Sequence, residues 1–296
     1  MIKPNFFIVG APKCGTTAMN DYLSRHPDIF MGKKELHYFG KDLMSKTRPS
    51  EQEYLEYFQG ANGAKIVGDA SVWYLFSETA AKEIKEFAPG ARILIMLRNP
   101  LIVIHSLHSQ HLYDGNEDVL DFETALGLDE ERKKGNHLPD SVGYTRLPPY
   151  KDSVLFSAQV KRYVDVFGKE NVRIILYEDF ITNTEKVVSE TLEFLGVKTK
   201  FQIDYHVINA NKRIKWFYLH RVIKRPPLKL KKMVRVMLPF RSVRHFIMFN
   251  LLKWNIKKGK RDEMDPELNR KLKTFFRQDI DSLGKMIGKD LSGWVE

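Results

Sequence analysis

Residues 6–19, FFIVGAPKCGTTAM, constrain the fold of this chain more than any other stretch. The apolar run 6–9 is rich in β-branched and aromatic residues, which predicts a buried strand. The run breaks at Gly10, passes Gly15 and continues into a predicted amphipathic helix over 16–25. A strand, a tight loop and a helix N-terminus bring backbone N–H groups and the positive end of the helix dipole together. We therefore expect this loop to bind a phosphate group.

The two glycines have the spacing of a Walker A loop, GxxxxGK[ST], but the lysine of that motif is missing. Thr16 occupies the Walker lysine position, and the loop's lysine, Lys13, comes earlier. We therefore expect phosphate to bind here, but not the β- and γ-phosphates of ATP. The alternative is a generic glycine-containing turn between a strand and a helix.

Three further apolar strands alternate with helical segments along the first 200 residues. The predicted strands are 65–69, 92–97 and 172–177, and the predicted helices are 50–59, 78–87, 154–167 and 185–195. This alternation predicts an α/β fold of three αβα layers with a mostly parallel central sheet, in a single domain over 1–296. Ligands of such sheets bind beyond the carboxyl ends of the strands. We expect the loops after the first three strands to share that edge.

The composition excludes several classes of protein. With 43% hydrophobic residues the chain can bury a full core. No stretch approaches the roughly 20 apolar residues of a spanning helix, and the early strand argues against a signal peptide. A single cysteine, Cys14, excludes an internal disulfide or a multi-cysteine metal site and fits a reducing, cytoplasmic location. Because Cys14 neighbours Lys13, a catalytic thiol is an alternative role for it.

The net charge of +11 is concentrated in residues 211–261, which contain 17 Lys or Arg and no Asp or Glu. The rest of the chain is slightly acidic, so an anionic partner is expected for this segment. Within it, 228–238 and 243–254 mix bulky apolar residues with Lys and Arg. Three interpretations stay open: an anionic membrane surface, a groove for an acidic acceptor, or a helical pair packed on the core with solvated basic faces. Nucleic acid is not favoured, because no recognition motif accompanies the charge.

A second phosphate site is indicated at the strand 92–97. Arg98 follows this strand directly, and Ser106 lies eight residues further on, in the next predicted helix. A kinase would more often place an acidic residue here to hold magnesium, whereas an arginine and a hydroxyl suit phosphate. The alternative is an arginine at the sheet edge and a surface serine. Two phosphate sites on one edge imply a nucleotide phosphorylated at both ends of its ribose.

These residues resemble the motifs of the sulfotransferases that use 3′-phosphoadenosine 5′-phosphosulfate (PAPS). The run 12–17, PKCGTT, is similar to their 5′-phosphosulfate loop, and Arg98 with Ser106 is similar to their 3′-phosphate motif. The runs 24–29, SRHPDI, and 34–39, KELHYF, most resemble the heparan-sulfate and bacterial carbohydrate branch. The resemblance covers roughly residues 5–200 and resumes at about 258–294.

The resemblance implies sulfuryl transfer from PAPS to a hydroxyl, in preference to an amine, of a carbohydrate, glycolipid or related small molecule, with no metal required. Lys13 would stabilise charge on the leaving oxygen, Glu35 would be the base, and His37 would orient Glu35 or contact the acceptor. The implied nucleotide-binding residues are Lys13, Cys14, Gly15, Thr16, Thr17 and Ala18 at the phosphosulfate, Arg98 and Ser106 at the 3′-phosphate, and Lys258 and Gly259 in a late loop. Glu35 as a solvated loop carboxylate and His37 as a packing residue are the alternatives.

The sequence departs from this family at one place. Relatives in the heparan-sulfate branch carry Lys-Thr-Pro or Lys-Ser-Pro after the second strand, whereas residues 69–74 here are DASVWY. The lysine is missing, so we expect the acceptor or its charge to differ. Two other functions stay open: a P-loop kinase or NTPase, opposed by Thr16, and a basic membrane- or nucleic-acid-binding module on a degenerate nucleotide fold. A cytoplasmic protein is expected, with peripheral membrane association as the alternative.

Overall fold

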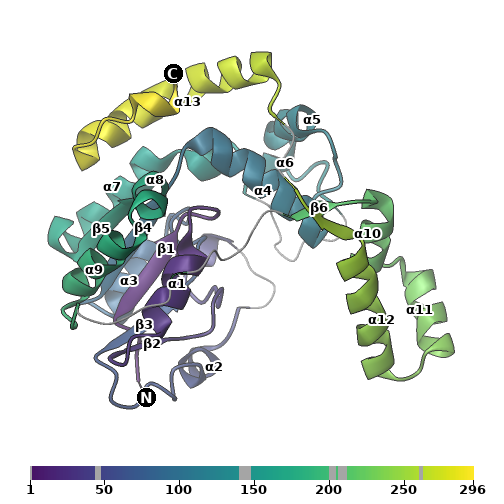
Figure 1. The fold of residues 1–296 in the computed structure, drawn as a ribbon, viewed down its shortest axis with the longest axis horizontal. Helices are drawn as coiled ribbons and strands as arrows, with labels where there is room; N and C mark the ends of the chain where they lie inside the picture. Colours follow the sequence, from purple (N-terminus) through teal and green to yellow (C-terminus); the bar gives the residue numbers. More distant parts are fainter. Residues whose placement is uncertain (1, 44–47, 140–147, 200–204, 206–211, 260–262) are drawn as a thin grey trace.

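The computed structural model describes residues 2–43, 48–139, 148–199, 205, 212–259 and 263–296. Its centre is a five-stranded parallel sheet with the strand order β2-β3-β1-β4-β5 (Figure 1). The strands are β1 (Phe6–Gly10), β2 (Ile29–Met31), β3 (Ile66–Ala70), β4 (Arg92–Leu97) and β5 (Val172–Leu176). Every residue of β1 is buried, as its unbroken apolar run predicts. β1 pairs with both β3 and β4, which confirms that the three strands share one carboxyl edge.

Helices cover both faces of the sheet, which confirms the predicted αβα layers. One layer contains α1 (Thr16–Ser24) and α9 (Thr184–Leu195), and the other contains α3 (Ala80–Phe87) and α7 (Phe156–Phe167). The long C-terminal helix α13 (Pro266–Ile287) packs outside α7 (Figure 1). The remaining helices are α2 (Glu51–Glu56), α4 (Pro100–Asp114), α5 (Phe122–Gly127), α6 (Asp129–Lys133), α8 (Tyr177–Thr182), α10 (Phe217–Lys224), α11 (Leu228–Met237) and α12 (Arg241–Trp254), with 3₁₀ turns at Lys41–Leu43, Asp152–Val154, Lys169–Asn171 and Ser292–Trp294.

Several predicted boundaries are wrong, for different physical reasons. The strand predicted over 172–177 ends at Leu176, because Tyr177 begins α8. The helix predicted from residue 154 begins at Phe156, whose backbone N–H donates to Asp279 Oδ2 at 2.8 Å. This cap comes from α13, more than 100 residues away, so local sequence could not indicate it. The edge strand β2 was not predicted, because it is only three residues long.

The basic segment forms a projecting helical arm, residues 217–254, made of α10, α11 and α12 (Figure 1). A short antiparallel pair, β6 (Lys212–Ile214) and β7 (Ile256–Lys258), lies at its base. α10 is fixed to the C-terminal end of α4, because a ring nitrogen of His220 lies 2.8 Å from the carbonyl oxygen of Tyr113. No residue of α12 is buried, so the interpretation of a helical pair packed on the core is wrong. No described helix is both long and apolar enough to cross a membrane.

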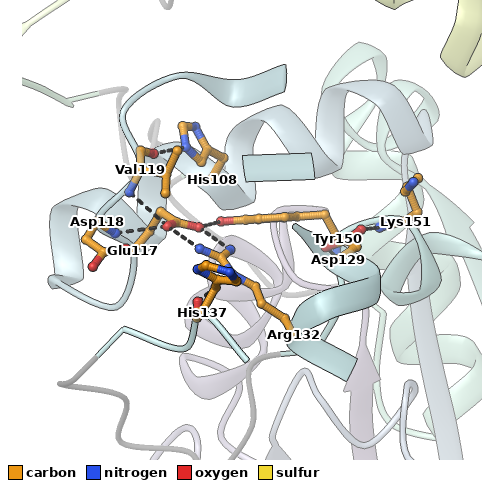
Figure 2. Close-up of polar contacts among 9 residues, drawn as sticks. All are labelled: His108, Glu117, Asp118, Val119, Asp129, Arg132, His137, Tyr150 and Lys151. Atoms are coloured by element: carbon orange, nitrogen blue, oxygen red, sulfur yellow. Dashed lines mark hydrogen bonds and ion pairs between the residues drawn. The ribbon is translucent and has the colours of Figure 1, made fainter. Parts of the chain in front are cut away.

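A buried ion pair anchors the segment that follows α4 (Figure 2). Arg132 donates from both terminal nitrogens to the carboxylate of Glu117, at 2.6 and 2.7 Å, and Tyr150 donates its hydroxyl at 2.8 Å. Burial alone would raise the pKa of Glu117, but the hydrogen bonds from Arg132 and from the backbone outweigh it and lower that pKa. Asp129 accepts the backbone N–H groups of Tyr150 and Lys151. These contacts join the segment after α4 to α6 and to the loop at Tyr150.

We expect Arg132→Met to lower the free energy of unfolding by about 3–5 kcal/mol, because it leaves the Glu117 carboxylate buried without its cation. Adding Glu117→Gln to this variant should recover part of the loss. Urea denaturation measures both changes. Asp165→Asn, which breaks the exposed pair of Lys161 and Asp165, is the control and should cost less than about 1 kcal/mol. An Arg132→Met variant as stable as this control would contradict the role of the buried pair.

Candidate functional site

The predicted phosphate loop joins β1 to α1. Gly15 is the N-cap residue of α1 and has a φ of 88°, a conformation that favours glycine. A Cβ atom there would lie 3.1 Å from the ring of Tyr177. No described side chain caps α1, and its first turn contains no acidic residue. The positive end of this helix can therefore accept an anion, and Thr16, Thr17 and Ala18 supply the backbone of its first turn.

Cys14 lies inside the core. Its side chain is fully buried, and Sγ donates to the carbonyl oxygen of Pro12 at 3.4 Å. Burial raises the pKa of the thiol far above its ordinary value. A buried neutral thiol is a poor nucleophile, so the catalytic-thiol alternative is wrong. The contribution of Cys14 to the loop is limited to its backbone.

Lys13 extends from the loop toward α4. Its φ of 66° is unusual for a residue other than glycine. Its Nζ donates to Gln110 Oε1 at 3.1 Å, and Gln110 Nε2 in turn donates to Asp114 Oδ2 at 2.7 Å. Sequence reasoning missed Gln110. The available signal was its position one turn after Ser106, which places both residues on one face of α4.

Glu35 and His37 lie in the loop that follows β2, beside the end of β3. Both have positive φ values, 61° and 49°. The N–H of Glu35 donates to the carbonyl oxygen of Ala70 at 2.9 Å, and its Oε2 accepts the N–H of Val72 at 3.3 Å. His37 Nε2 lies 3.4 Å from the same Oε2. The two residues are therefore in contact, as expected if His37 orients Glu35.

A buried carboxylate, Asp69, organises the loop that carries these residues. Tyr54 and Tyr74 donate to its Oδ2 at 2.9 and 3.0 Å, and Ser71 donates to its Oδ1 at 3.0 Å. The oxygen of Ser71 accepts the N–H of His37, and that of Tyr74 accepts the N–H of Tyr38. The hydroxyl groups thus connect the core charge to the backbone of the loop. Burial raises the pKa of Asp69 to about 6.

The environment shifts the pKa values of both loop residues. The Glu35 side chain is 37% exposed, but the surrounding protein partly desolvates its carboxylate and raises its pKa, while the positive charge of Lys34 opposes that shift. Burial lowers the pKa of His37 to about 4, so its imidazole is neutral near pH 7. A carboxylate with a raised pKa beside a neutral imidazole is suited to accept a proton.

Lys34 connects this loop to the phosphate loop, a role that sequence reasoning missed. Its Nζ donates to Thr17 Oγ1 at 2.9 Å and lies 3.7 Å from Glu35 Oε1. Burial lowers the pKa of Lys34, although the Glu35 carboxylate acts in the opposite direction. The sequence shows two adjacent lysines, Lys33 and Lys34, and only the fold distinguishes them: Lys33 is exposed and Lys34 half-buried.

Arg98 and Ser106 lie on the other side of the phosphate loop. The guanidinium of Arg98 stacks 4.2 Å from the ring centre of Tyr177, the same ring that limits the space at Gly15. Ser106 is buried in α4. Within the described residues, Arg98 Nε and Ser106 Oγ are buried and have no hydrogen-bond partner. Because buried polar atoms are normally bonded, a further polar group is expected here.

The late loop predicted to cover the nucleotide is only partly described. Lys258 ends β7, and Gly259 follows it. The side chain of Lys258 and residue 260 lie outside the described part of the chain, so a contact with nucleotide there stays a prediction. The other site residues, Lys13, Glu35, His37 and Arg98, follow β1, β2 and β4, which are parallel strands of one sheet.

The sequence is similar to known sulfotransferases. Carbohydrate sulfotransferase 15 of Homo sapiens is 27% identical over 248 residues, which cover 66% of this chain and 44% of that protein. Heparan sulfate glucosamine 3-O-sulfotransferase 5 of Mus musculus is 22% identical over 292 residues, covering 98% of this chain and 73% of that one. The chain thus spans less than half of the first relative.

A solved structure and a family model also match this chain. A crystal structure of a sulfotransferase from Alicyclobacillus acidocaldarius has a TM-score of 0.73 and 32% sequence identity, covering 100% of both chains. The sulfotransferase domain family matches residues 3–284, which is nearly the whole sequence. The chain belongs to the sulfotransferase family.

Proposed function

We propose that this sulfotransferase moves a sulfuryl group from PAPS to a hydroxyl, in preference to an amine, of a carbohydrate, glycolipid or related small molecule. The observation that carries the choice of donor is the pair of buried, unpartnered atoms Arg98 Nε and Ser106 Oγ, taken among the described residues. Arg98 stacks on the ring of Tyr177, the same ring that borders Gly15 in the phosphate loop. Ser106 lies on α4, whose Gln110 bonds to Lys13 of that loop. A nucleotide with a 5′-phosphosulfate and a 3′-phosphate would bring anions to both places.

The chemistry assigns separate roles to Lys13 and Glu35. The acceptor oxygen attacks sulfur, while the bond between sulfur and the bridging oxygen breaks and its electron pair stays on the departing 5′-phosphate. Lys13 stabilises the charge that develops on the bridging oxygen. Glu35 takes the proton of the acceptor hydroxyl. Gln110 positions Lys13 through the 3.1 Å hydrogen bond between them.

The environment of Glu35 supports its role as base. Its raised pKa makes it a better proton acceptor than a carboxylate of ordinary pKa, and Lys34 still favours the ionised form near pH 7. Lys34 also donates to Thr17 in the first turn of α1. The side chain of Lys34 therefore connects the proposed base, Glu35, with the proposed donor site.

The proposed acceptor class rests on the named relatives and on the absence of a lysine from the loop after β3. Relatives named as carbohydrate and heparan sulfate sulfotransferases support a carbohydrate acceptor. The run 69–74, at the end of β3, contains no lysine. We infer that the acceptor carries fewer anionic groups near its reactive hydroxyl than heparan sulfate does.

Calorimetry should show binding of 3′,5′-adenosine bisphosphate, and Arg98→Met or Ser106→Ala should weaken it. We expect a loss of about 10- to 100-fold for Arg98→Met, the effect of one hydrogen bond to a charged group. Binding of adenosine 5′-monophosphate, which lacks the 3′-phosphate, should change much less. Arg277→Met, at an exposed position, is the matched control. Tight binding of ATP with magnesium in place of the bisphosphate would overturn the proposed donor.

Glu35→Gln should abolish turnover while leaving affinity for the bisphosphate within about threefold of wild type. Loss of a general base lowers the rate by about 10²- to 10⁴-fold. Mass spectrometry of a panel of acceptors incubated with PAPS measures transfer, and calorimetry measures the affinity. Glu56→Gln, an exposed substitution of the same kind, should retain full activity. A Glu35→Gln variant with wild-type turnover would remove Glu35 from the reaction.

The rate should fall as the pH drops through the raised pKa of Glu35, at a pH above the ordinary value of 4.5. Protonation removes the base, so activity is present above this pKa and lost below it. Because the pKa of His37 is lowered to about 4, the acid limb of kcat/KM should persist in His37→Gln. Disappearance of that limb in the histidine variant would show that His37 is the titrating group.

A further inference from the structure

The helical arm exposes an unusual amount of apolar surface. Of the 19 large hydrophobic side chains that are exposed in the described part of the chain, 14 lie between residues 216 and 254. They are Trp216, Tyr218, Val222, Met233, Val236, Met237, Phe240, Val243, Phe246, Ile247, Met248, Phe249, Leu251 and Trp254. Exposed apolar surface of this extent indicates an interaction site.

The tip of the arm, where α11 meets α12, exposes three large apolar side chains. Val236 is 82% exposed, and Met237 and Phe240 are each 71% exposed. The turn between the helices is held by Arg244, whose guanidinium donates to the carbonyl oxygens of Leu238 and Pro239 at 2.5 and 2.7 Å. The arm therefore presents apolar side chains at its end without burying them against the protein.

Basic side chains surround this apolar surface. On α11, the exposed residues Lys229, Lys231, Lys232 and Arg235 lie within two turns of the tip. The segment 211–261 contains no acidic residue that could neutralise them. A surface that is both apolar and cationic is complementary to a lipid bilayer, which has an apolar interior and can carry anionic head groups.

We propose that the arm binds an anionic membrane surface. Val236, Met237 and Phe240 enter the boundary between head groups and acyl chains, and the lysines of α11 contact anionic head groups. The arm lies at the surface, since no described helix is long and apolar enough to span the membrane. A second copy of the chain fits less well, because its arm would bring like charges together.

The base of the arm relates this surface to the active site. α10 contacts the end of α4 through His220 and Tyr113, and Arg221 lies 3.4 Å from Asp118. Earlier turns of α4 carry Ser106 and Gln110. Membrane binding would hold the enzyme at a lipid surface, where acceptors with a membrane anchor are found. This inference goes beyond the proposed transfer reaction and does not depend on it.

Sedimentation of the full chain with lipid vesicles tests the proposal without any donor nucleotide. We expect binding to phosphatidylcholine vesicles that contain phosphatidylglycerol, and little binding to phosphatidylcholine alone. The charge variant Lys231→Glu, Lys232→Glu, Arg235→Glu should weaken binding by about 100-fold or more. The tip variant Val236→Ser, Met237→Ser, Phe240→Ser should weaken it by at least about tenfold.

Two control variants make the same changes on the body of the protein. Lys82→Glu, Arg277→Glu, Lys285→Glu alters the charge equally, and Leu120→Ser, Ile181→Ser, Phe275→Ser removes exposed apolar side chains. Both should bind vesicles as wild type does. Absence of vesicle binding, or equal binding by the arm variants and wild type, would overturn the proposal. So would analytical ultracentrifugation showing a dimer that the tip variant converts to a monomer, because the arm would then be a contact between copies.

Discussion

The geometry of the catalytic loop depends on one buried charge, the carboxylate of Asp69 at the end of β3. Three hydroxyl groups donate to it, and two of their oxygens accept backbone N–H groups of the loop. Burial raises the pKa of Asp69 to about 6. Its contribution to stability is therefore greatest below the unfolded value near 3.8 and is lost as the pH rises through about 6. Near neutral pH the ionised Asp69 carboxylate therefore lowers the free energy of unfolding, while its hydrogen bonds hold the loop of Glu35 and His37 in place.

Backbone strain is concentrated at the same site. Four described residues other than glycine have a positive φ, and three of them are Lys13, Glu35 and His37. Such conformations cost about 1–3 kcal/mol each and persist when the surroundings determine them. Here the surroundings are the hydrogen bonds from Glu35 to Ala70 and from His37 to Ser71. Lys13 is constrained from the other side by Gln110.

The sequence predicted the sheet, its shared edge and the tight loop between β1 and α1, because each depends on local patterns. The apolar run of β1 and the turn at Gly15 are such patterns, since burial and φ follow from the residues themselves. The sequence did not assign roles to Gln110 and Lys34, although Gln110 lies one turn after Ser106. Their roles come from partners brought close by the fold, Lys13 for one and Thr17 for the other. The sequence could not predict what the arm binds either. Its alternating apolar and basic residues are found both in helices that pack on a core and in helices that stay exposed.

The arm can keep apolar side chains in water because its base is fixed independently of them. The side chain of Asn255 accepts the N–H of Trp216 and donates to its carbonyl oxygen, both at 2.9 Å, so that it acts like a neighbouring strand. Asn255 is fully buried, and these bonds clamp the end of α12 to the start of α10. The bonds at Tyr113 then join α10 to α4. A fixed base and an apolar, cationic tip are what a surface-binding element requires, because ordering the arm costs little when it binds.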